Sequence, residues 1–161
     1  MIRRVTIKDA AGIQEIYNYY VENTAITFEE KPAALGEMET RIRGIGEKYP
    51  WFIREDDGDE VLGYAYANAW KERPSYRYSA ELSIYVRNGH QGKGIGGELM
   101  TLLLEELRKT DIHALISGIT LPNEQSVALH ERFGFRNIAC FREIGFKLGK
   151  WLDVGYWELI L

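Results

Sequence analysis

The chain has 161 residues and a formal net charge of −4, with 45% hydrophobic and 27% charged residues. This length fits a single domain over residues 1–161. The acidic balance argues against a nucleic-acid surface, and no apolar run approaches the ~18 residues of a membrane span. Three histidines and one cysteine indicate no metal site. The N-terminus reads as a strand and not as a signal peptide, so we expect a cytoplasmic protein.

The N-terminal third is expected to contain one short strand and two helices. A strand is predicted at Arg3 to Ile7, and a helix begins at Lys8-Asp9. One face of this helix is apolar at helical spacing, through Ile13, Ile16, Tyr17, Tyr20 and Val21. A connecting loop is expected at Ala25 to Glu30, and a second helical region at Pro32 to about Tyr49.

The rest of the chain alternates strands with two further helices. Strands are predicted at Trp51 to Glu55, Val61 to Trp70, Tyr78 to Val86, His113 to Ile119, Arg136 to Ile144 and Trp151 to Leu161. The helices are Gly94 to Thr110 and a short one that Asn123 caps and Phe133-Gly134 ends. The only cysteine, Cys140, lies in an apolar run and is expected to be a buried structural thiol. This order predicts a mixed α/β sheet with one strand–helix–strand crossover.

The junction between the strand that ends at Val86 and the helix that begins at Gly94 is the most informative segment. It is rich in glycine, through Gly92, Gly94, Gly96 and Gly97. Unpaired N–H groups at a helix N-terminus, together with the helix dipole, attract a phosphate, and glycine lets it approach the backbone. We therefore predict a pyrophosphate site, although many glycine-rich turns bind nothing.

Three known phosphate-binding patterns could apply to this turn. The P-loop pattern is absent, and a dinucleotide fingerprint is formally present as Gly92-x-Gly94-x-x-Gly97. The strand that follows lacks the acidic residue that would hold a ribose. The third pattern, Gln91-x-x-Gly94-x-Gly96, resembles the coenzyme A loop of the GNAT superfamily of acyl-CoA-dependent N-acyltransferases.

Longer segments resemble one GNAT subfamily, the acetyltransferases for phosphinothricin, methionine sulfone and methionine sulfoximine. These segments are Tyr76 to Val86, His90 to Gly96, Leu121 to Phe135 and Gly145 to Val154. The resemblance implies the GNAT fold, with a central mixed, largely antiparallel sheet flanked by helices. It also implies transfer of an acetyl group from acetyl-CoA to the amine of a small amino-acid-like substrate.

The resemblance implies a set of residues that bind acetyl-CoA. Backbone groups of Ile84 and Val86 would lie along pantetheine, which adds to the sheet as an extra strand. The pyrophosphate would be bound by Gln91, Gly92, Lys93, Gly94, Ile95, Gly96 and Gly97. Asn123 would contact the pantetheine arm, although capping a helix is the commoner role for such an asparagine.

Two residues are candidates for catalysis. Glu81 is a carboxylate within an otherwise apolar strand, where it is either ion-paired or functional. The resemblance makes Glu81 the general base that removes a proton from the acceptor amine. His130 lies where many GNAT enzymes have a tyrosine that protonates the leaving thiolate, and the phosphinothricin-type enzymes have histidine there. A structural role remains the alternative for both residues.

A zwitterionic acceptor needs a cation for its carboxylate, and arginine forks match carboxylates well. Lys71, Arg73 and Arg77 all flank the loop before Glu81, and which of them binds the carboxylate is left open. The resemblance favours Arg77 and, less firmly, Arg73. Phe28 and Glu29 match a segment that forms the substrate wall.

Two other functions compete with this interpretation. The same fold could acetylate an antibiotic amine, a polyamine or a protein N-terminus, or the chain could be a non-catalytic acyl-CoA sensor. Because related enzymes are often dimers, a homodimer is expected, and the apolar C-terminal strand that ends at Leu161 would suit an interface.

Overall fold

The computed structural model describes all 161 residues. Its strands are β1 (Ile2–Arg4), β2 (Trp51–Glu55), β3 (Val61–Ala69), β4 (Ser79–Val86), β5 (Ala114–Leu121), β6 (Arg136–Lys147) and β7 (Lys150–Ile160). Its α-helices are α1 (Ala10–Asn23), α2 (Leu35–Gly46), α3 (Ile95–Leu107) and α4 (Glu124–Arg132). Two short 3₁₀ turns cover Ile7–Asp9 and Pro74–Tyr76.

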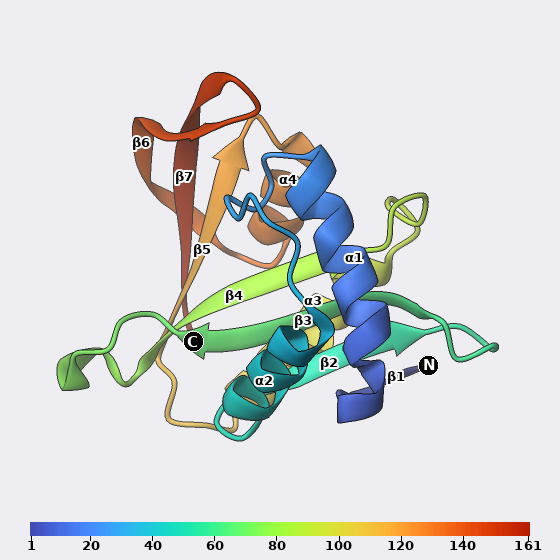
Figure 1. The fold of residues 1–161 in the computed structure, drawn as a ribbon. Helices are drawn as coiled ribbons and strands as arrows, with labels where there is room; N and C mark the ends of the chain where they lie inside the picture. Colours follow the sequence, from blue (N-terminus) through green and yellow to red (C-terminus); the bar gives the residue numbers. More distant parts are fainter.

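All seven strands form one sheet in the order β1-β2-β3-β4-β5-β7-β6. Only the central pair, β4 and β5, is parallel, and this pair bonds over just three positions, from Ser79 with Ala114 to Glu81 with Ile116. Beyond that point β5 rises away from β4, so the sheet splits into two wings (Figure 1). The predicted mixed, largely antiparallel sheet is confirmed.

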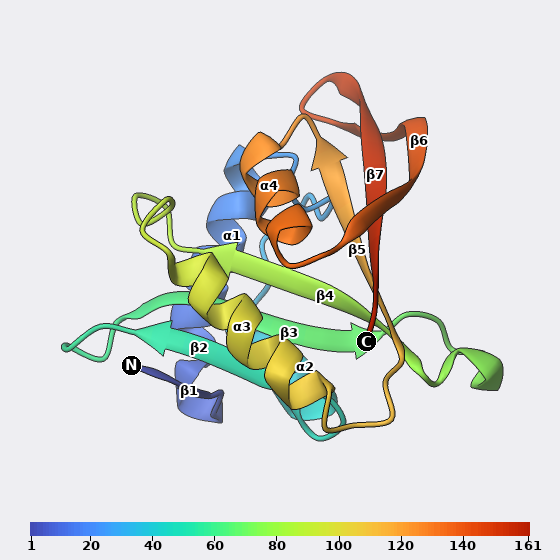
Figure 2. The same cartoon turned by 180° about the vertical axis from the view of Figure 1, so that it is seen from behind.

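The helices cover both faces of the wing that contains β1 to β4. Helices α1 and α2 lie on one face (Figure 1), and α3 crosses the other face, with α4 beside β5 above it (Figure 2). Each face buries its own apolar cluster, one around Leu99 and Leu103 of α3 and the other around Ile13 and Ile16 of α1. No helix is long and apolar enough to cross a membrane.

Strand β4 separates these two clusters through the alternation of its side chains. Ala80 and Leu82 lie in the α3 cluster, and Ile84 packs against it. Tyr85 packs against the α1 cluster. The strand therefore has one apolar face toward α3 and a second face, which carries Glu81, toward α1.

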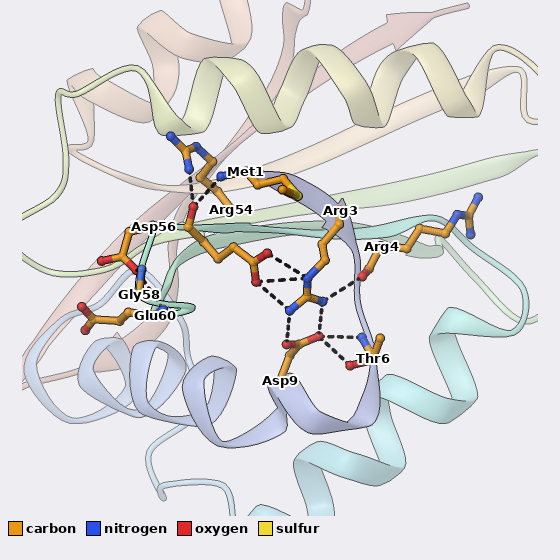
Figure 3. Close-up of polar contacts among 10 residues, drawn as sticks. Met1, Arg3, Arg4, Thr6, Asp9, Arg54, Asp56, Gly58 and Glu60 are labelled. Carbon is orange, nitrogen blue, oxygen red and sulfur yellow. Dashed lines mark hydrogen bonds and ion pairs between the residues drawn. The ribbon is translucent and has the colours of Figure 1, made fainter.

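The first strand is shorter than predicted, because an ion cluster turns the chain into α1. Arg3 bonds to Asp9 at 2.8 Å and to Glu55 at 2.7 Å, which joins the N-terminus to β2 (Figure 3). Asp9 also accepts hydrogen bonds from the backbone N–H and the hydroxyl of Thr6. These bonds curl residues 7–9 into a 3₁₀ turn where an extended strand was expected.

We expect Arg3→Met to lower the free energy of unfolding by about 3 kcal/mol, because it leaves Asp9 and Glu55 buried without a cation. Arg4→Met is the matched control, since Arg4 is exposed and lies 3.5 Å from Glu106, and it should change stability by less than about 0.5 kcal/mol. Urea denaturation measures both variants. Equal free energies of unfolding for the two variants would show that the ion cluster does not stabilise the fold.

This cluster also gives the stability a pH dependence. Burial opposes ionisation of Asp9, but hydrogen bonds from Arg3 and Thr6 outweigh it, so the pKa of Asp9 is lowered in the fold. The stabilisation is therefore present above the ordinary pKa of an aspartate and is lost as the pH falls through the lowered value.

Helix α2 begins three residues later than predicted. Side chains of α1 bind the backbone of Ala33, since Asn18 accepts its N–H at 2.8 Å and Gln14 donates to its carbonyl at 2.9 Å. A backbone held in this way cannot start the helix, so α2 starts at Leu35.

The prediction for Cys140 is wrong, because its side chain is exposed. It lies in β6, which is the edge strand of the sheet. No helix covers this part of β6, and several of its apolar side chains also face solvent, namely Ile138, Phe141, Ile144 and Phe146.

Candidate functional site

The gap between the two wings exposes main-chain groups of β4. Arg87 donates its backbone N–H to the carbonyl oxygen of Leu62 at 2.8 Å, so the backbone groups of Arg87 point toward β3. Because backbone groups alternate in direction along a strand, those of Leu82, Ile84 and Val86 point to the side that β5 has left. A ligand could therefore pair with β4 as an added strand.

The glycine-rich turn lies at the end of β4 and leads into α3. Gly92 and Gly94 have φ of +75° and +87°, and a Cβ at either position would meet no other atom within 4 Å. Gly94 is the N-cap of α3 and has no side chain to bond the first N–H groups of the helix. These groups and the open space beside them fit an anion.

A cavity of about 420 Å³ joins the gap to this turn. Most predicted cofactor residues line it, together with one catalytic candidate: Ile84, Val86, Gln91, Gly92, Gly94, Gly96, Gly97, Asn123 and His130. The predicted Lys93 and Ile95 do not line it, since Lys93 is exposed and Ile95 is buried in the core. Tyr20 of α1 and Ile26, which follows α1, also line the cavity, although no motif in the sequence marks them.

Asn123 has the capping role predicted for it. Its side-chain oxygen accepts the N–H of Ser126 at 3.1 Å and so begins α4. Because Asn123 also lines the cavity, its capping role is compatible with the predicted contact to a cofactor.

His130 is buried at 5% exposure, with its ring edge-on to Phe135. Its Nδ1 lies 2.7 Å from the carbonyl oxygen of Ser126, so Nδ1 carries a proton and donates it. Burial lowers the pKa of His130, although the Ser126 bond opposes this effect. The neutral ring therefore has a proton-free Nε2, which is an acceptor. A ring in this state cannot donate a proton from Nε2, which is the role that the tyrosine at this position has in many GNAT enzymes.

Glu81 lies at the point where β4 and β5 separate, as the last residue of β4 paired with β5. Its side chain is half-buried, and no ion pair or hydrogen bond engages its carboxylate. Burial raises the pKa of Glu81, and the charge of Lys71 partly opposes this rise. The structural ion pair considered as an alternative is therefore absent.

An aromatic wall stands beside Glu81, and its central residue, Tyr156, was not predicted from the sequence, whereas Trp70 was a candidate for an aromatic pocket. Tyr156 of β7 lies edge-on to Trp70 at 5.9 Å and to Phe141 at 5.5 Å. A Cβ at Gly118 would lie 3.2 Å from the Tyr156 ring, so this glycine leaves room for the ring. Burial and the charge of Glu81 both raise the pKa of Tyr156. The pairing of β7 with β5 brings Tyr156 to Gly118, and its pairing with β6 brings Tyr156 to Phe141.

Phe28 and Glu29 lie in the loop between α1 and α2, and this loop is fixed against neighbouring elements. The Phe28 ring occupies the space above Gly145, where a Cβ would lie 2.3 Å from it. Glu29 accepts hydrogen bonds from Tyr17 and from Arg41. Burial would raise the pKa of Glu29, but these two bonds lower it. Glu29 therefore already has its partners within the chain.

The three candidate cations for a carboxylate differ in their surroundings. Their loop projects beyond the ends of β3 and β4 (Figure 1). Arg77 covers the ring of Tyr78 at 4.4 Å and donates to the carbonyl of Pro74. Arg73 and Lys71 are exposed, but Lys71 lies 5.0 Å above the Trp70 ring, at the edge of the aromatic wall. Of the three, only Lys71 affects the pKa of Glu81.

No group of three or more His, Cys, Asp or Glu side chains gathers where it could hold a metal ion.

Comparison with known proteins identifies the family. The model of the acetyltransferase (GNAT) domain matches residues 2–155. This chain belongs to the GNAT acetyltransferases. It is 36% identical to the phosphinothricin N-acetyltransferase of Streptomyces viridochromogenes, over 98% of this chain and 85% of that protein. It is 35% identical to the L-methionine sulfoximine/L-methionine sulfone acetyltransferase of Pseudomonas aeruginosa, over 99% and 94%.

Solved GNAT structures have the same fold. A phosphinothricin acetyltransferase from Sinorhizobium meliloti, solved in complex with AcCoA, superimposes with a TM-score of 0.96 at 35% identity. The match covers 100% of this chain and 88% of that one. The GNAT fold and the resemblance to these subfamilies are therefore confirmed.

Proposed function

We propose that this GNAT chain transfers an acetyl group from acetyl-CoA to the amine of a small amino-acid-like acceptor. One observation carries the proposal: the unpaired carboxylate of Glu81 lies at the closed end of the gap whose open end leads to the glycine turn. Glu81 and Val86 are five residues apart, which is roughly 17 Å along a strand. That span suits an extended arm with a pyrophosphate at one end and a thioester at the other.

The residues that line the cavity fit acetyl-CoA in this orientation. The unpaired backbone groups of Leu82 and Ile84 would bond to the pantetheine arm, and the N–H groups of the turn around Gly94 would bind the pyrophosphate. Acetyl-CoA supplies an acetyl thioester. The acceptor would approach from the α1–α2 face of the sheet, where Glu81 and Tyr156 lie.

Glu81 acts as the general base in this proposal. An alkylammonium cannot attack a carbonyl until it loses a proton, and the carboxylate of Glu81 takes that proton. Its raised pKa makes the carboxylate a stronger base than that of an ordinary glutamate. The free amine then forms the C–N bond as the C–S bond breaks.

The second proton of the amine must pass from nitrogen to sulfur. His130 is neutral, with Nε2 free to accept that proton and then to release it to the thiolate. His130 thus relays this proton from the amine to the thiolate, and it does not begin the reaction as a charged imidazolium.

The acceptors named for the relatives, phosphinothricin and methionine sulfoximine or sulfone, all carry a free carboxylate beside the amine. We infer that Lys71 binds this carboxylate, helped by Arg77. Of the three cations, only Lys71 has a charge that lowers the pKa of Glu81. We expect release of coenzyme A with these acids and poor turnover of their methyl esters. A thiol-release assay over a panel of amines measures this difference.

Single variants separate the three cations. Lys71→Met should raise KM for the acids about tenfold and change the esters little, since an orienting ion pair acts in the ground state. Arg77→Ala should raise KM less, and Arg73→Ala, which alters the same loop, is the control. Equal wild-type activity on acid and ester would contradict an amino-acid acceptor and favour a broader amine acetyltransferase. No thiol release with any amine would favour an acyl-CoA sensor.

We infer a homodimer built on the exposed apolar residues of β6 and the β6–β7 hairpin, among them Phe141, Phe146 and Trp151, the last 64% exposed. The C-terminal strand first considered is internal, between β5 and β6, and its Trp157 belongs to the core. Sedimentation equilibrium tests the dimer.

A cytoplasmic location is proposed as well, because acetyl-CoA is made and used inside the cell.

A further inference from the structure

Helix α1 contacts the segment between β4 and α3 through two side chains: Glu15 forms an exposed ion pair with Arg87, and Tyr20 bonds to Val86 and Gln91. This tyrosine is 7% exposed and packs against Tyr85 and Tyr19, with both pairs of ring centroids 5.5 Å apart. Its hydroxyl nevertheless lies at the cavity, on the side opposite to α4.

The Tyr20 hydroxyl joins the end of β4 to the turn. It donates a hydrogen bond to the carbonyl oxygen of Val86. It also accepts a hydrogen bond from the side-chain amide of Gln91 at 3.2 Å. The amide oxygen of Gln91 in turn accepts the backbone N–H of Gly89 at 2.8 Å. One hydroxyl therefore fixes both ends of residues 86–91.

The bond to Val86 also limits where a ligand can pair with β4. The carbonyl of Val86 is the last of those that face the gap, and Tyr20 already occupies one of its acceptor positions. A pantetheine arm that runs along Leu82 and Ile84 therefore meets a satisfied carbonyl at Val86. From that point the cofactor has to turn toward the N–H groups of Gly92 and Gly94.

We propose that Tyr20 is a positioning residue for the cofactor. Tyr20 acts through Gln91 and holds the glycine turn in the conformation that binds pyrophosphate. The inference rests on the proposed use of acetyl-CoA and adds a residue that no motif in the turn contains. Tyr20 does not act on the acetyl group or on the acceptor, so its effect should be confined to cofactor affinity.

Tyr20→Phe removes only the hydroxyl and keeps the ring that packs against Tyr85. We expect the Kd for coenzyme A, measured by calorimetry, to rise about tenfold, because two hydrogen bonds that order the turn are lost. The KM for acetyl-CoA should rise in parallel, whereas kcat at saturation and the acceptor KM should stay within about twofold. Tyr19→Phe is the matched control and should bind like the wild type, since the Tyr19 hydroxyl has no hydrogen-bond partner.

Two measurements separate positioning of the turn from a general loss of structure. S-acetyl-pantetheine has no pyrophosphate, so kcat/KM with this donor should be the same in Tyr20→Phe and in the wild type. In a Gln91→Ala background, Tyr20→Phe should cost much less than it does alone, because the residue that it acts through is gone.

Three outcomes would overturn the inference: unchanged affinity of Tyr20→Phe for coenzyme A, an equal loss with S-acetyl-pantetheine, or full additivity with Gln91→Ala. Failure of the wild-type protein to bind coenzyme A would instead contradict the proposed function. The two failures are therefore distinguishable.

Discussion

Glu81→Gln is expected to lower kcat/KM for the acceptor roughly 10²–10⁴-fold at neutral pH, which is the usual contribution of a general base. The substitution keeps the size of the side chain and removes its ability to take a proton. The carboxylate of Glu81 has no ion pair or hydrogen bond to lose, so the fold should be unaffected.

The pH dependence of this variant distinguishes a base from a structural residue. Burial raises the pKa of Glu81, so wild-type kcat/KM should rise with pH and level off above that pKa, where the carboxylate is ionised. The rise due to Glu81 should be absent from Glu81→Gln. Its defect should shrink at high pH, where free amine exists without help.

Glu81→Asp is a control that keeps the negative charge but shortens the side chain. It keeps a carboxylate but withdraws it by one methylene, so it should recover part of the activity and retain a pH profile of the wild-type form. Activity of Glu81→Gln close to that of the wild type at neutral pH would mean that Glu81 is not the base.

Gly94→Val is expected to weaken binding of coenzyme A at least 100-fold, which corresponds to about 2.7 kcal/mol. Gly94 has φ of +87° at the N-cap of α3, and the space beside its Cα is open. A branched side chain would fill that space where a pyrophosphate has to meet the N–H groups of the helix. Calorimetry with coenzyme A measures the loss.

Gly149→Val is the matched control for backbone strain. Gly149 has φ of +75° and is equally open, but it lies in the hairpin between β6 and β7, away from the cavity. Both variants should lose a similar amount of stability, about 1–2 kcal/mol, since valine is disfavoured at such φ. Only Gly94→Val should lose cofactor binding, and equal affinities for the two variants would remove the pyrophosphate assignment.

Much of the fold could be predicted from local patterns. The apolar spacing of α1, the alternation along β4 and the glycine turn before α3 each depend on neighbours in sequence, and the structure has all three. Predictions failed where distant side chains decide the outcome. Arg3 ends β1 by binding Asp9 and Glu55, and Asn18 delays α2 by binding Ala33.

The candidate site divides in the same way. Nine of the predicted residues line one cavity, because their positions follow from the strand, the turn and the two helices that the sequence marks. The contact of Tyr156 with Trp70 and the bond from Tyr20 to Gln91 have no such signal. They join residues far apart in the chain, and only the order of strands in the sheet and the packing of α1 bring them into contact.

The sequence by itself determined the family, the glycine turn and the carboxylate within β4, because each is encoded by residues close together in the chain. Only the tertiary structure decided that Glu81 lacks a partner, that His130 has a proton-free Nε2 and that Cys140 is exposed. Burial, protonation and hydrogen bonding depend on which elements pack together. In this chain they depend on the separation of β5 from β4 and on β6 forming the edge of the sheet.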